Sequence, residues 1–264
     1  MAQPMRVLQH QQLPPEAEQL AAMYQLGTPQ VEYRTRARVG VIIAWGILGG
    51  ILGCIFLLAG VGSASDVATM ITFFIIGLLI LGVVLYCALL PLTYRSWRAY
   101  TCTEGFVIVR GSRVDAFRWD QIGAMWYAVT RYSSYGVYRR TIHKYTIRRK
   151  DGVKVMLDDR FADVETLGNT ISRELTRCLL PQVINAYNAG STITFGPFSV
   201  SLQGVGNGRE LLPWNQIKEL RVNRGFVMAR KEGKWLTWSA VRVADVPNIF
   251  VFMALVDYVL KGQK

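Results

Sequence analysis

Residues 39–62 read VGVIIAWGILGGILGCIFLLAGVG, and residues 67–92 read VATMITFFIIGLLILGVVLYCALLPL. Neither run contains a charged residue, and both exceed the roughly 20 apolar residues that a helix needs to cross a bilayer. Only Ser63-Ala64-Ser65-Asp66 separates the runs, so two helices here would be antiparallel neighbours. The sequence therefore predicts a two-helix transmembrane hairpin over 39–62 and 67–92.

The charges around this hairpin predict its orientation. Three arginines between positions 34 and 38 precede the first run, and Arg95 and Arg98 follow the second. The connecting loop carries only Asp66. Because cytoplasmic flanks of membrane helices carry an excess of Lys and Arg, we expect an integral cell-membrane protein with both termini in the cytoplasm.

The first apolar run contains two overlapping G-x-x-x-G spacings, Gly46/Gly50 and Gly49/Gly53. Small residues let helix backbones approach closely. Packing against the second helix of the same chain accounts for these glycines, and homodimerisation through the same face is the alternative. No ionisable residue lies inside either run, which argues against an ion pathway or a proton relay. We therefore expect the hairpin to be an anchor.

The rest of the chain is hydrophilic and basic. The 264 residues include 30 Lys and Arg against 18 Asp and Glu, a net charge of +12, and the basic surplus falls after Leu92. A basic surface suggests an anionic partner, such as lipid headgroups, nucleic acid or an acidic protein. Solubility together with the bias of cytoplasmic flanks is the plainer explanation.

The sequence carries no motif for catalysis or metal binding. The four cysteines are scattered without a C-x-x-C pair, so we expect no metal and no cofactor. The two histidines, His10 and His143, do not belong to any hydrolase, metalloprotease or phosphate-binding motif. Asp158 and Asp159 are adjacent and would face opposite sides of a strand, so a turn is the better interpretation. We therefore expect a non-enzymatic protein.

An internal repeat organises the region after the hairpin. Three short motifs recur in the same order: Trp119-Asp120-Gln121-Ile122 as Trp214-Asn215-Gln216-Ile217, Lys150-Asp151-Gly152 as Lys231-Glu232-Gly233, and Ala162-Asp163-Val164 as Ala244-Asp245-Val246. We expect both recurring tryptophans in the core. The predicted division is a polar N-terminal segment with a short helix (1–38), the hairpin (39–92), a first repeat (93–190) and a second repeat (191–264).

Each repeat reads as a run of short strands followed by one helix. In the first, Asp163 is the expected N-cap, and Pro181 is expected to kink or end the helix. In the second, Asp245 is the expected cap of an apolar helix over 249–260, which is too short to span a membrane. Short antiparallel strands capped by a helix, twice over, are typical of tandem pleckstrin-homology-like (PH-like) rolls. The predicted fold class is thus a transmembrane hairpin plus an α+β cytoplasmic region.

The chain resembles bacterial membrane proteins with a two-helix hairpin and a PH-like tail, and more narrowly one uncharacterised family of unknown function. The stretches that carry this resemblance are Arg118-Trp119-Asp120-Gln121-Ile122, His143-Lys144-Tyr145-Thr146, Asn185-Ala186-Tyr187-Asn188-Ala189-Gly190, Gly208-Arg209-Glu210-Leu211-Leu212-Pro213-Trp214 and Gly233-Lys234-Trp235-Leu236. The resemblance covers nearly all of 94–262. It implies an architecture and no activity.

The first repeat carries an insertion that the second lacks. The stretch from Tyr127 to Lys150 contains bases and tyrosines but no acid, and Ser133-Ser134-Tyr135-Gly136 reads as a turn. A long basic hairpin of this kind can lie against an anionic inner leaflet, where tyrosine suits the headgroup depth. The candidate lipid- or partner-binding residues are Arg131, Tyr132, Tyr135, Tyr138, Arg139, Arg140, Lys144, Arg148 and Arg149. A solvated hairpin without a ligand is the alternative, and nucleic acid is disfavoured because no recognition motif is present.

These observations lead to one functional expectation and one alternative. We expect a non-enzymatic, membrane-anchored PH-like binding or scaffold protein that contacts anionic lipid headgroups or a protein partner at the inner membrane face. The alternative is a structural membrane component with no ligand, which could dimerise through the glycine face of the first helix.

Overall fold

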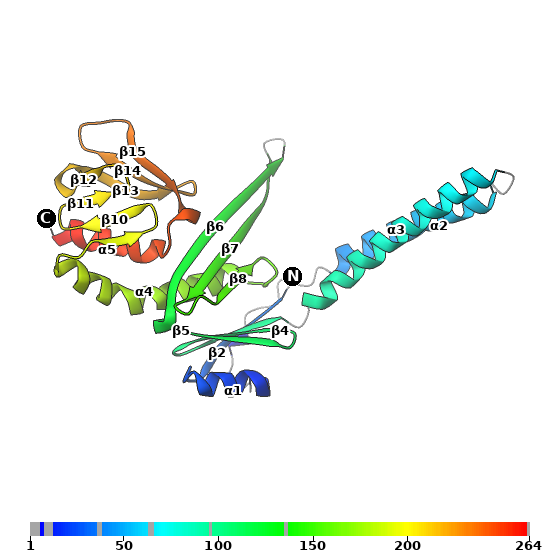
Figure 1. The fold of residues 1–264 in the computed structure, drawn as a ribbon, viewed down its shortest axis with the longest axis horizontal. Coiled ribbons are helices and arrows are strands. Elements are labelled where there is room, and N and C mark those ends of the chain that lie inside the picture. The colour runs from blue at the N-terminus through cyan, green and yellow to red at the C-terminus, as the bar shows by residue number, and fades with distance from the viewer. Residues whose placement is uncertain are drawn as a thin grey trace.

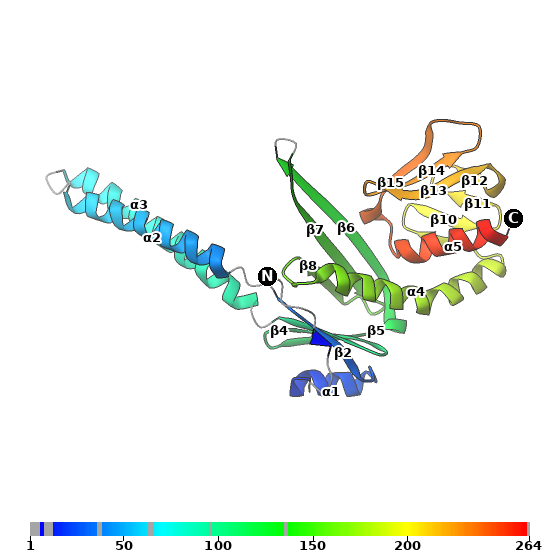
Figure 2. The same ribbon diagram turned by 180° about the vertical axis from the view of Figure 1, so that it is seen from behind.

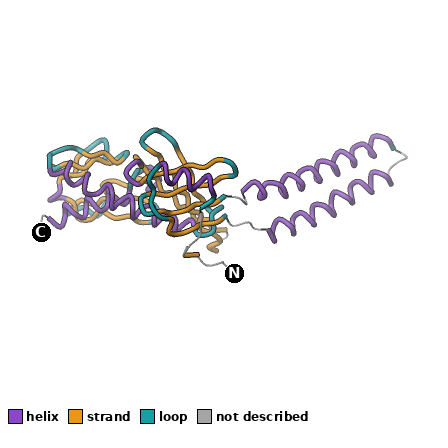
Figure 3. Tube along the Cα trace, turned by 90° about the horizontal axis from the view of Figure 1, so that it is seen from below, coloured by secondary structure: helices purple, strands orange, loops and turns teal. Residues whose placement is uncertain are grey.

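A computed structural model describes the backbone of residues 6–7, 13–35, 39–62, 66–94, 97–134 and 137–262, and the side chains of these residues except 6–7, 39–45, 88, 90–94 and 131–140. The described part is an α+β protein with five α-helices and four small antiparallel sheets. This confirms the predicted α+β class. A pair of long helices extends from one end of the globular body, and the C-terminus lies at the other end (Figures 1 and 3).

The first unit of the body contains two sheets, which a long helix follows in the chain. Its strands are β1 (Arg6–Val7), β2 (Pro29–Arg34), β3 (Arg98–Cys102), β4 (Gly105–Arg110), β5 (Arg113–Arg118), β6 (Ile122–Ser134), β7 (Val137–Arg149) and β8 (Lys154–Asp158). The strand orders are β1-β2-β3-β4-β5 and β6-β7-β8. Helix α4 (Val164–Asn188) follows, and Leu167, Ile171 and Leu175 of its first half pack into the core with Phe106 and Trp119.

The second unit repeats this arrangement. Its elements are β9 (Ile193–Phe195), β10 (Phe198–Ser201), β11 (Gly204–Gly206), β12 (Leu211–Pro213), β13 (Ile217–Asn223), β14 (Phe226–Lys231), β15 (Thr237–Arg242) and helix α5 (Ile249–Gly262). The strand orders are β12-β11-β10-β9 and β13-β14-β15. No described strand of one unit pairs with a strand of the other, so the units are separate sheet systems.

The recurring tryptophans occupy the same place in both units. Trp119 and Trp214 each open a short 3-10 turn between the two sheets, and both are buried. The indole N–H of Trp119 donates to the carbonyl of Thr103 at 3.0 Å, and that of Trp214 donates to the carbonyl of Ser201 at 2.9 Å. These carbonyls lie at the equivalent turns, β3–β4 and β10–β11. The match makes β2–β5 the counterparts of β9–β12 and confirms the prediction that both tryptophans are core residues.

This match shows that two long helices interrupt the first unit. Helices α2 (Val39–Gly62) and α3 (Val67–Tyr94) lie between β2 and β3 in the sequence, yet these strands are antiparallel neighbours, with Arg34 opposite Arg98. In the second unit, the equivalent strands β9 and β10 are joined directly by Gly196 and Pro197. The helices therefore stand in place of a two-residue turn. We call a chain in which Asn-Gly replaces residues 36–96 the turn-joined chain.

The predicted boundary at residue 93 therefore needs correction, because residues 13–35 belong to the first unit. Besides β2, this segment supplies the expected short helix, α1 (Pro15–Met23). Ala17 and Ala21 of this helix, together with Leu26, pack on the first sheet against Tyr100 and Val107. The segment is polar in composition, but Leu13 and Tyr33 are buried as well.

An ion-pair network joins β2 and β3 where the chain leaves for the helices and returns. The buried carboxylate of Glu32 accepts a hydrogen bond from Arg34 at 2.9 Å and one from the hydroxyl of Tyr100 at 3.3 Å. Arg98 Nη1 lies 3.5 Å from the same carboxylate. Both arginine side chains stay about half exposed, so the network ties the two ends of the helical pair together without burying the flanking charge.

Helices α2 and α3 run side by side as an antiparallel pair (Figures 1 and 2). A methyl group at Gly49 would overlap Val84, and one at Gly53 would overlap Leu81. These two glycines therefore let α3 approach α2. Gly46 and Gly50 have no described atom within 4 Å of an added methyl group, so they do not take part in this contact.

Helix α4 connects the cores of the two units. Its second half, with Leu180, Val183 and Ile184, packs against the core of the second unit around Phe252. Of the two outcomes predicted for Pro181, a kink or an end, the helix does not end there but runs on to Asn188. Proline inside a helix removes one backbone hydrogen bond and costs about 3 kcal/mol. Burial of the apolar side chains around it on the second unit offsets that cost.

Candidate functional site: the basic hairpin and the cleft beside it

The insertion predicted in the first repeat is a long β-hairpin. Strands β6 and β7 pair from Ile122 opposite Arg149 out to Ser134 opposite Val137. Their counterparts β13 and β14 end at Asn223 and Phe226, which makes that hairpin much shorter. The long hairpin projects from the body between the second unit and the helical pair (Figures 1 and 2). The predicted turn includes residues 135–136, which lie outside the described residues.

Alternation along β7 separates structural side chains from exposed bases. Tyr145 and Ile147 point into the core, whereas Lys144 and Arg148 are exposed on the opposite, outer face of the sheet. Lys154 on β8 is in register with Arg148 and is also exposed. The guanidinium of Arg148 lies over the ring of Trp126, 5.2 Å from its centroid. We call this outer surface, made of Lys144, Arg148, Lys154 and Trp126, the basic face.

One carboxylate borders the basic face and is already neutralised. Asp158 is opposite Lys144 in register, and its carboxylate accepts hydrogen bonds from Arg160, the closest at 2.7 Å. Met156, which lies between Lys154 and Asp158 on β8, is 37% exposed. The face therefore combines cationic and apolar groups with little competing negative charge.

Several residues predicted from the sequence cannot be placed on this face by their side chains. Tyr135 lies outside the described residues. The structure describes the backbone but not the side chains of Arg131, Tyr132, Tyr138, Arg139 and Arg140. Of the nine predicted candidates, Lys144, Arg148 and Arg149 have described side chains, and the first two lie on the basic face.

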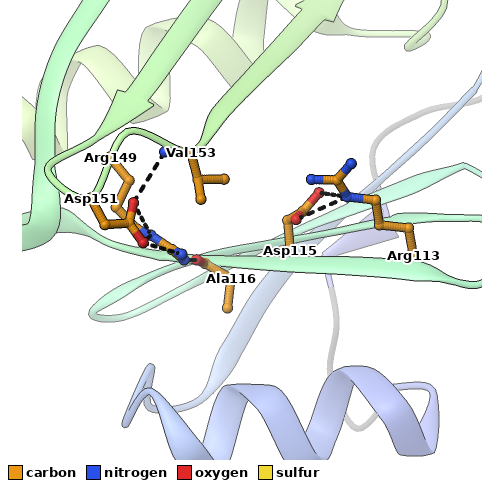
Figure 4. Close-up of polar contacts among 6 residues, drawn as sticks. All are labelled: Arg113, Asp115, Ala116, Arg149, Asp151 and Val153. Carbon is orange, nitrogen blue, oxygen red and sulfur yellow. Dashed lines mark hydrogen bonds and ion pairs between the residues drawn. The ribbon is translucent and has the colours of Figure 1, made fainter.

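Arg149 is a structural residue rather than a contact residue (Figure 4). Its guanidinium donates to both carboxylate oxygens of Asp151, at 2.6 Å for the closest pair, and to the carbonyl of Ala116 at 2.6 Å. The same group lies over the rings of Tyr24 and Phe117, at 5.4 and 5.5 Å. The hydrogen bonds from Arg149 hold the pKa of Asp151 below its usual value. Arg149 thus fastens the β7–β8 turn to β5 and α1. It is therefore no longer a candidate for contact with a lipid or a partner.

Arg149→Ala and Arg148→Ala should therefore differ although they are adjacent arginines. In the turn-joined chain, Arg149→Ala should lower the free energy of unfolding by about 2 kcal/mol, because the Ala116 carbonyl and the Asp151 carboxylate lose a largely buried charged donor. Arg148→Ala should change it by less than about 0.5 kcal/mol, as expected for an exposed side chain. Urea unfolding followed by circular dichroism measures both. Equal effects would contradict this assignment.

A cleft of about 1190 Å³ separates the hairpin from the second unit. On the hairpin side it is bordered by residues 127–130 of β6 and by Thr141 and His143 of β7, and Glu165 of α4 lies at its base. The opposite wall is formed by residues 222–226, at the β13–β14 turn, and by 242–244. The cleft is thus formed only where both units meet.

Three polar side chains lie next to one another on the hairpin side of the cleft. The hydroxyl of Tyr127 lies 3.2 Å from Nδ1 of His143, and Nε2 of His143 lies 3.7 Å from the carboxylate of Glu165. The backbone N–H of His143 donates to Asp159 at 3.1 Å. These groups can hydrogen-bond a ligand. Sequence reasoning did not connect them, because Tyr127 and His143 meet only through the register of two strands.

The described residues contain no cluster of three His, Cys, Asp or Glu side chains that could hold a metal ion. All four cysteines are free thiols. Burial raises the pKa of Cys102 to about 11, so this thiol is not activated as a nucleophile.

The geometry defines an α+β protein of two similarly built units, with a basic sheet face and a cleft between the units. The chain belongs to DUF6585, a family of unknown function, whose model matches residues 1–264. This confirms the resemblance to an uncharacterised family that the sequence motifs indicated. No curated protein and no solved structure matches the chain.

Proposed function

We propose that this chain is a non-enzymatic, membrane-anchored protein whose basic face contacts anionic lipid headgroups at the inner side of the cell membrane. In this proposal, α2 and α3 span the bilayer, both termini are cytoplasmic, and the two units are PH-like rolls. The observation that carries the lipid contact is the basic face, with three exposed bases and a tryptophan ring over which Arg148 lies.

Exposed apolar side chains support the membrane anchor. They are Ile47, Leu48, Ile51, Leu52, Ile55, Leu58 and Val61 on α2, and Val67, Ile71, Ile75, Ile76, Leu78, Leu79, Val83, Leu85, Tyr86 and Leu89 on α3. A soluble protein rarely exposes so extensive an apolar surface to water, whereas a bilayer solvates it. Among the described residues, 67–87 of α3 are a stretch long and apolar enough to cross a membrane, and 46–62 of α2 are a shorter apolar stretch.

The element order supports the PH-like interpretation. Each unit has a sheet containing four consecutive strands, a second sheet of three strands and a C-terminal helix packed into the same core. The first unit adds β1 and α1 outside this common set. Two units with the same order, and with equivalent tryptophan hydrogen bonds, are what a tandem of such rolls requires.

The charge of the basic face is sufficient for contact by a protein that is already anchored. Each Lys or Arg near an anionic leaflet contributes about 1 kcal/mol. Three bases would therefore contribute about 3 kcal/mol, and the bases at 131, 139 and 140 of the same hairpin would add to this attraction. Trp126 suits the headgroup region, where an aromatic ring and its N–H meet both apolar and polar surroundings.

Neutralising the basic face should remove most lipid binding. The turn-joined chain would be tested by flotation with vesicles of phosphatidylcholine alone and with vesicles that also contain phosphatidylglycerol. Lys144→Gln, Arg148→Gln and Lys154→Gln combined should weaken binding to anionic vesicles about a hundred-fold, which corresponds to about 3 kcal/mol. Neutralising the exposed bases Arg209, Lys218 and Lys234 of the second unit is the matched control and should have little effect. Equal losses from both triple variants would contradict the proposal.

A further inference from the structure

Strand β6 lies at an edge of the sheet β6-β7-β8 and among the described strands pairs only with β7. An edge strand presents a row of backbone N–H and C=O groups to which another extended chain can bind. Proteins usually protect such edges with bulges or charges. In β6 the register shifts lie between Ile122 and Ala124 and between Tyr132 and Ser133, which leaves a regular strand between them.

One residue of the second unit already binds the inner end of this edge as a neighbouring strand would. The backbone N–H of Asn248 donates to the carbonyl of Met125 at 2.8 Å, and the N–H of Met125 donates to the side-chain oxygen of Asn248 at 2.8 Å. The side-chain amide of Asn248 also donates to the carbonyl of Gly123 at 3.2 Å. Asn248 has a positive φ of 51°, a conformation that asparagine adopts more readily than most residues. The inner end of the edge therefore already holds a strand-like partner.

The cleft continues along this edge from the point where Asn248 ends. Residues 127–130 are consecutive, so their side chains alternate between the two faces of the sheet, and yet all four border the cleft. This is the arrangement expected of a cleft that follows the strand's edge. Because outward-facing backbone groups recur every second residue, Val129 and Arg131 present theirs in the same direction as Met125. From Tyr127 to Arg131, beyond the residue that Asn248 binds, the edge is about 13 Å long.

The walls of the cleft indicate the chemistry of its occupant. Arg224, at the β13–β14 turn, and Arg242 lie on the wall opposite β6. Arg242 pairs with Asp245 at 2.8 Å, and Glu165 is the acid among the described residues that line the cleft. Phe226 and Phe250, which also line the cleft, are 42% and 41% exposed. The volume of about 1190 Å³ exceeds the roughly 300–1,000 Å³ of a typical small-molecule site. An extended peptide with alternating apolar and acidic side chains matches the strand edge, the aromatic surface and the cation of Arg224.

We propose that the β6 edge and this cleft bind an extended acidic peptide segment of a partner protein, which adds to the sheet as a strand beside β6. Charge favours this occupant over a second copy of the chain, because two copies would bring their basic hairpins together. The proposal does not rest on lipid contact. Lys144, Arg148 and Lys154 lie on the outer face of the sheet and do not line the cleft.

The test uses the full chain in nanodiscs of phosphatidylcholine and a fluorescent peptide of alternating valine and glutamate. Two control peptides separate the contributions: one with lysine for glutamate, and one with N-methylated alternate residues, which cannot pair as a strand. We expect binding of the acidic peptide by fluorescence anisotropy, at least tenfold weaker binding of the lysine peptide and none of the methylated one. Absence of acidic-peptide binding, or equal binding of either control peptide, would overturn the proposal.

Variants locate the binding site. Val129→Pro removes one outward N–H from an edge position, where proline is tolerated, and should weaken binding at least tenfold. Arg224→Glu should weaken it by a similar factor through charge. The combined Lys144, Arg148 and Lys154 to Gln variant should bind the peptide as the unmodified chain does. If that variant lost binding while Val129→Pro retained it, the peptide would be binding the basic face and the edge proposal would fail.

Discussion

A fragment comprising residues 93–264 should fail to fold its first unit, whereas the turn-joined chain should fold and remain soluble. The fragment lacks β2, so it loses the buried Tyr33 and Glu32 and leaves β3 at the edge of the sheet. It also lacks α1 and Leu26, which cover the first sheet. Each large buried side chain that is removed costs about 2–5 kcal/mol, and a domain has only about 5–15 kcal/mol in total.

The two chains are compared by urea unfolding, monitored by circular dichroism and tryptophan fluorescence, and by amide hydrogen exchange. The turn-joined chain should show the full unfolding transition, and Trp119 should be shielded from a soluble quencher. In the fragment, amide exchange of β3–β5 should be fast while that of the second unit stays slow. If the fragment protected β3–β5 as well as the turn-joined chain does, the assignment of residues 13–35 to the first unit would be wrong.

Gly168→Ala should destabilise the first unit, although alanine normally stabilises a helix relative to glycine by about 1 kcal/mol. Gly168 lies in α4 and is buried against the ring of Tyr145, which is itself fully buried. A methyl group here would overlap three ring carbons of Tyr145. Because the ring has no room to move in a packed core, we expect a loss of about 2–3 kcal/mol.

The measurement is urea unfolding of the turn-joined chain, with Asn169→Ala as the matched control on the exposed side of the same helix. The control should be neutral or slightly stabilising. Adding Tyr145→Leu to Gly168→Ala should cost less than the sum of the two single changes, because the smaller side chain leaves room for the methyl group. A Gly168→Ala chain as stable as the unmodified one would show that α4 does not lie this close to β7.

Most of the fold could be predicted because its signals are local. The two apolar runs and the strands of the repeat are visible as composition and alternation. The two tryptophan motifs occupy equivalent positions in their units because each indole N–H makes the same kind of hydrogen bond. Strand β2 could not be assigned to the first unit in this way. Its partner β3 lies beyond the two helices in the chain, and no local pattern reports a pairing across that distance.

Two other differences have physical reasons of the same kind. The sequence suggested Asp245 as the cap of the last helix, but Asp245 pairs with Arg242 at 2.8 Å, and the helix begins only at Ile249. Asn248 is directed to β6 instead, in an interaction between units that no local motif reports. Asp163 does directly precede α4 as predicted, although its side chain makes no capping hydrogen bond.

In the candidate site too, local features could be predicted from the sequence and long-range ones could not. The basic insertion and its hairpin were predictable from composition and from the turn residues between positions 133 and 136. Which bases face outward depends on the strand register, and this separates the exposed Arg148 from its neighbour Arg149, which is bound to Asp151. The cleft was not predictable, because its two walls come from different units.

The central claim, that the basic face lies against an anionic leaflet, is tested most directly in the full chain. A spin label at position 146, between Lys144 and Arg148 on the basic face, would be introduced after replacement of the four native cysteines. Its collision with a water-soluble nickel reagent would be compared in nanodiscs of phosphatidylcholine alone and in nanodiscs that also contain phosphatidylglycerol. A label at position 169 on α4 is the control.

We predict that collisions with the label at position 146 fall several-fold when anionic lipid is present and recover at high salt, whereas the control label does not change. Equal accessibility of position 146 in both membranes would contradict the claim and leave the hairpin as a solvated surface.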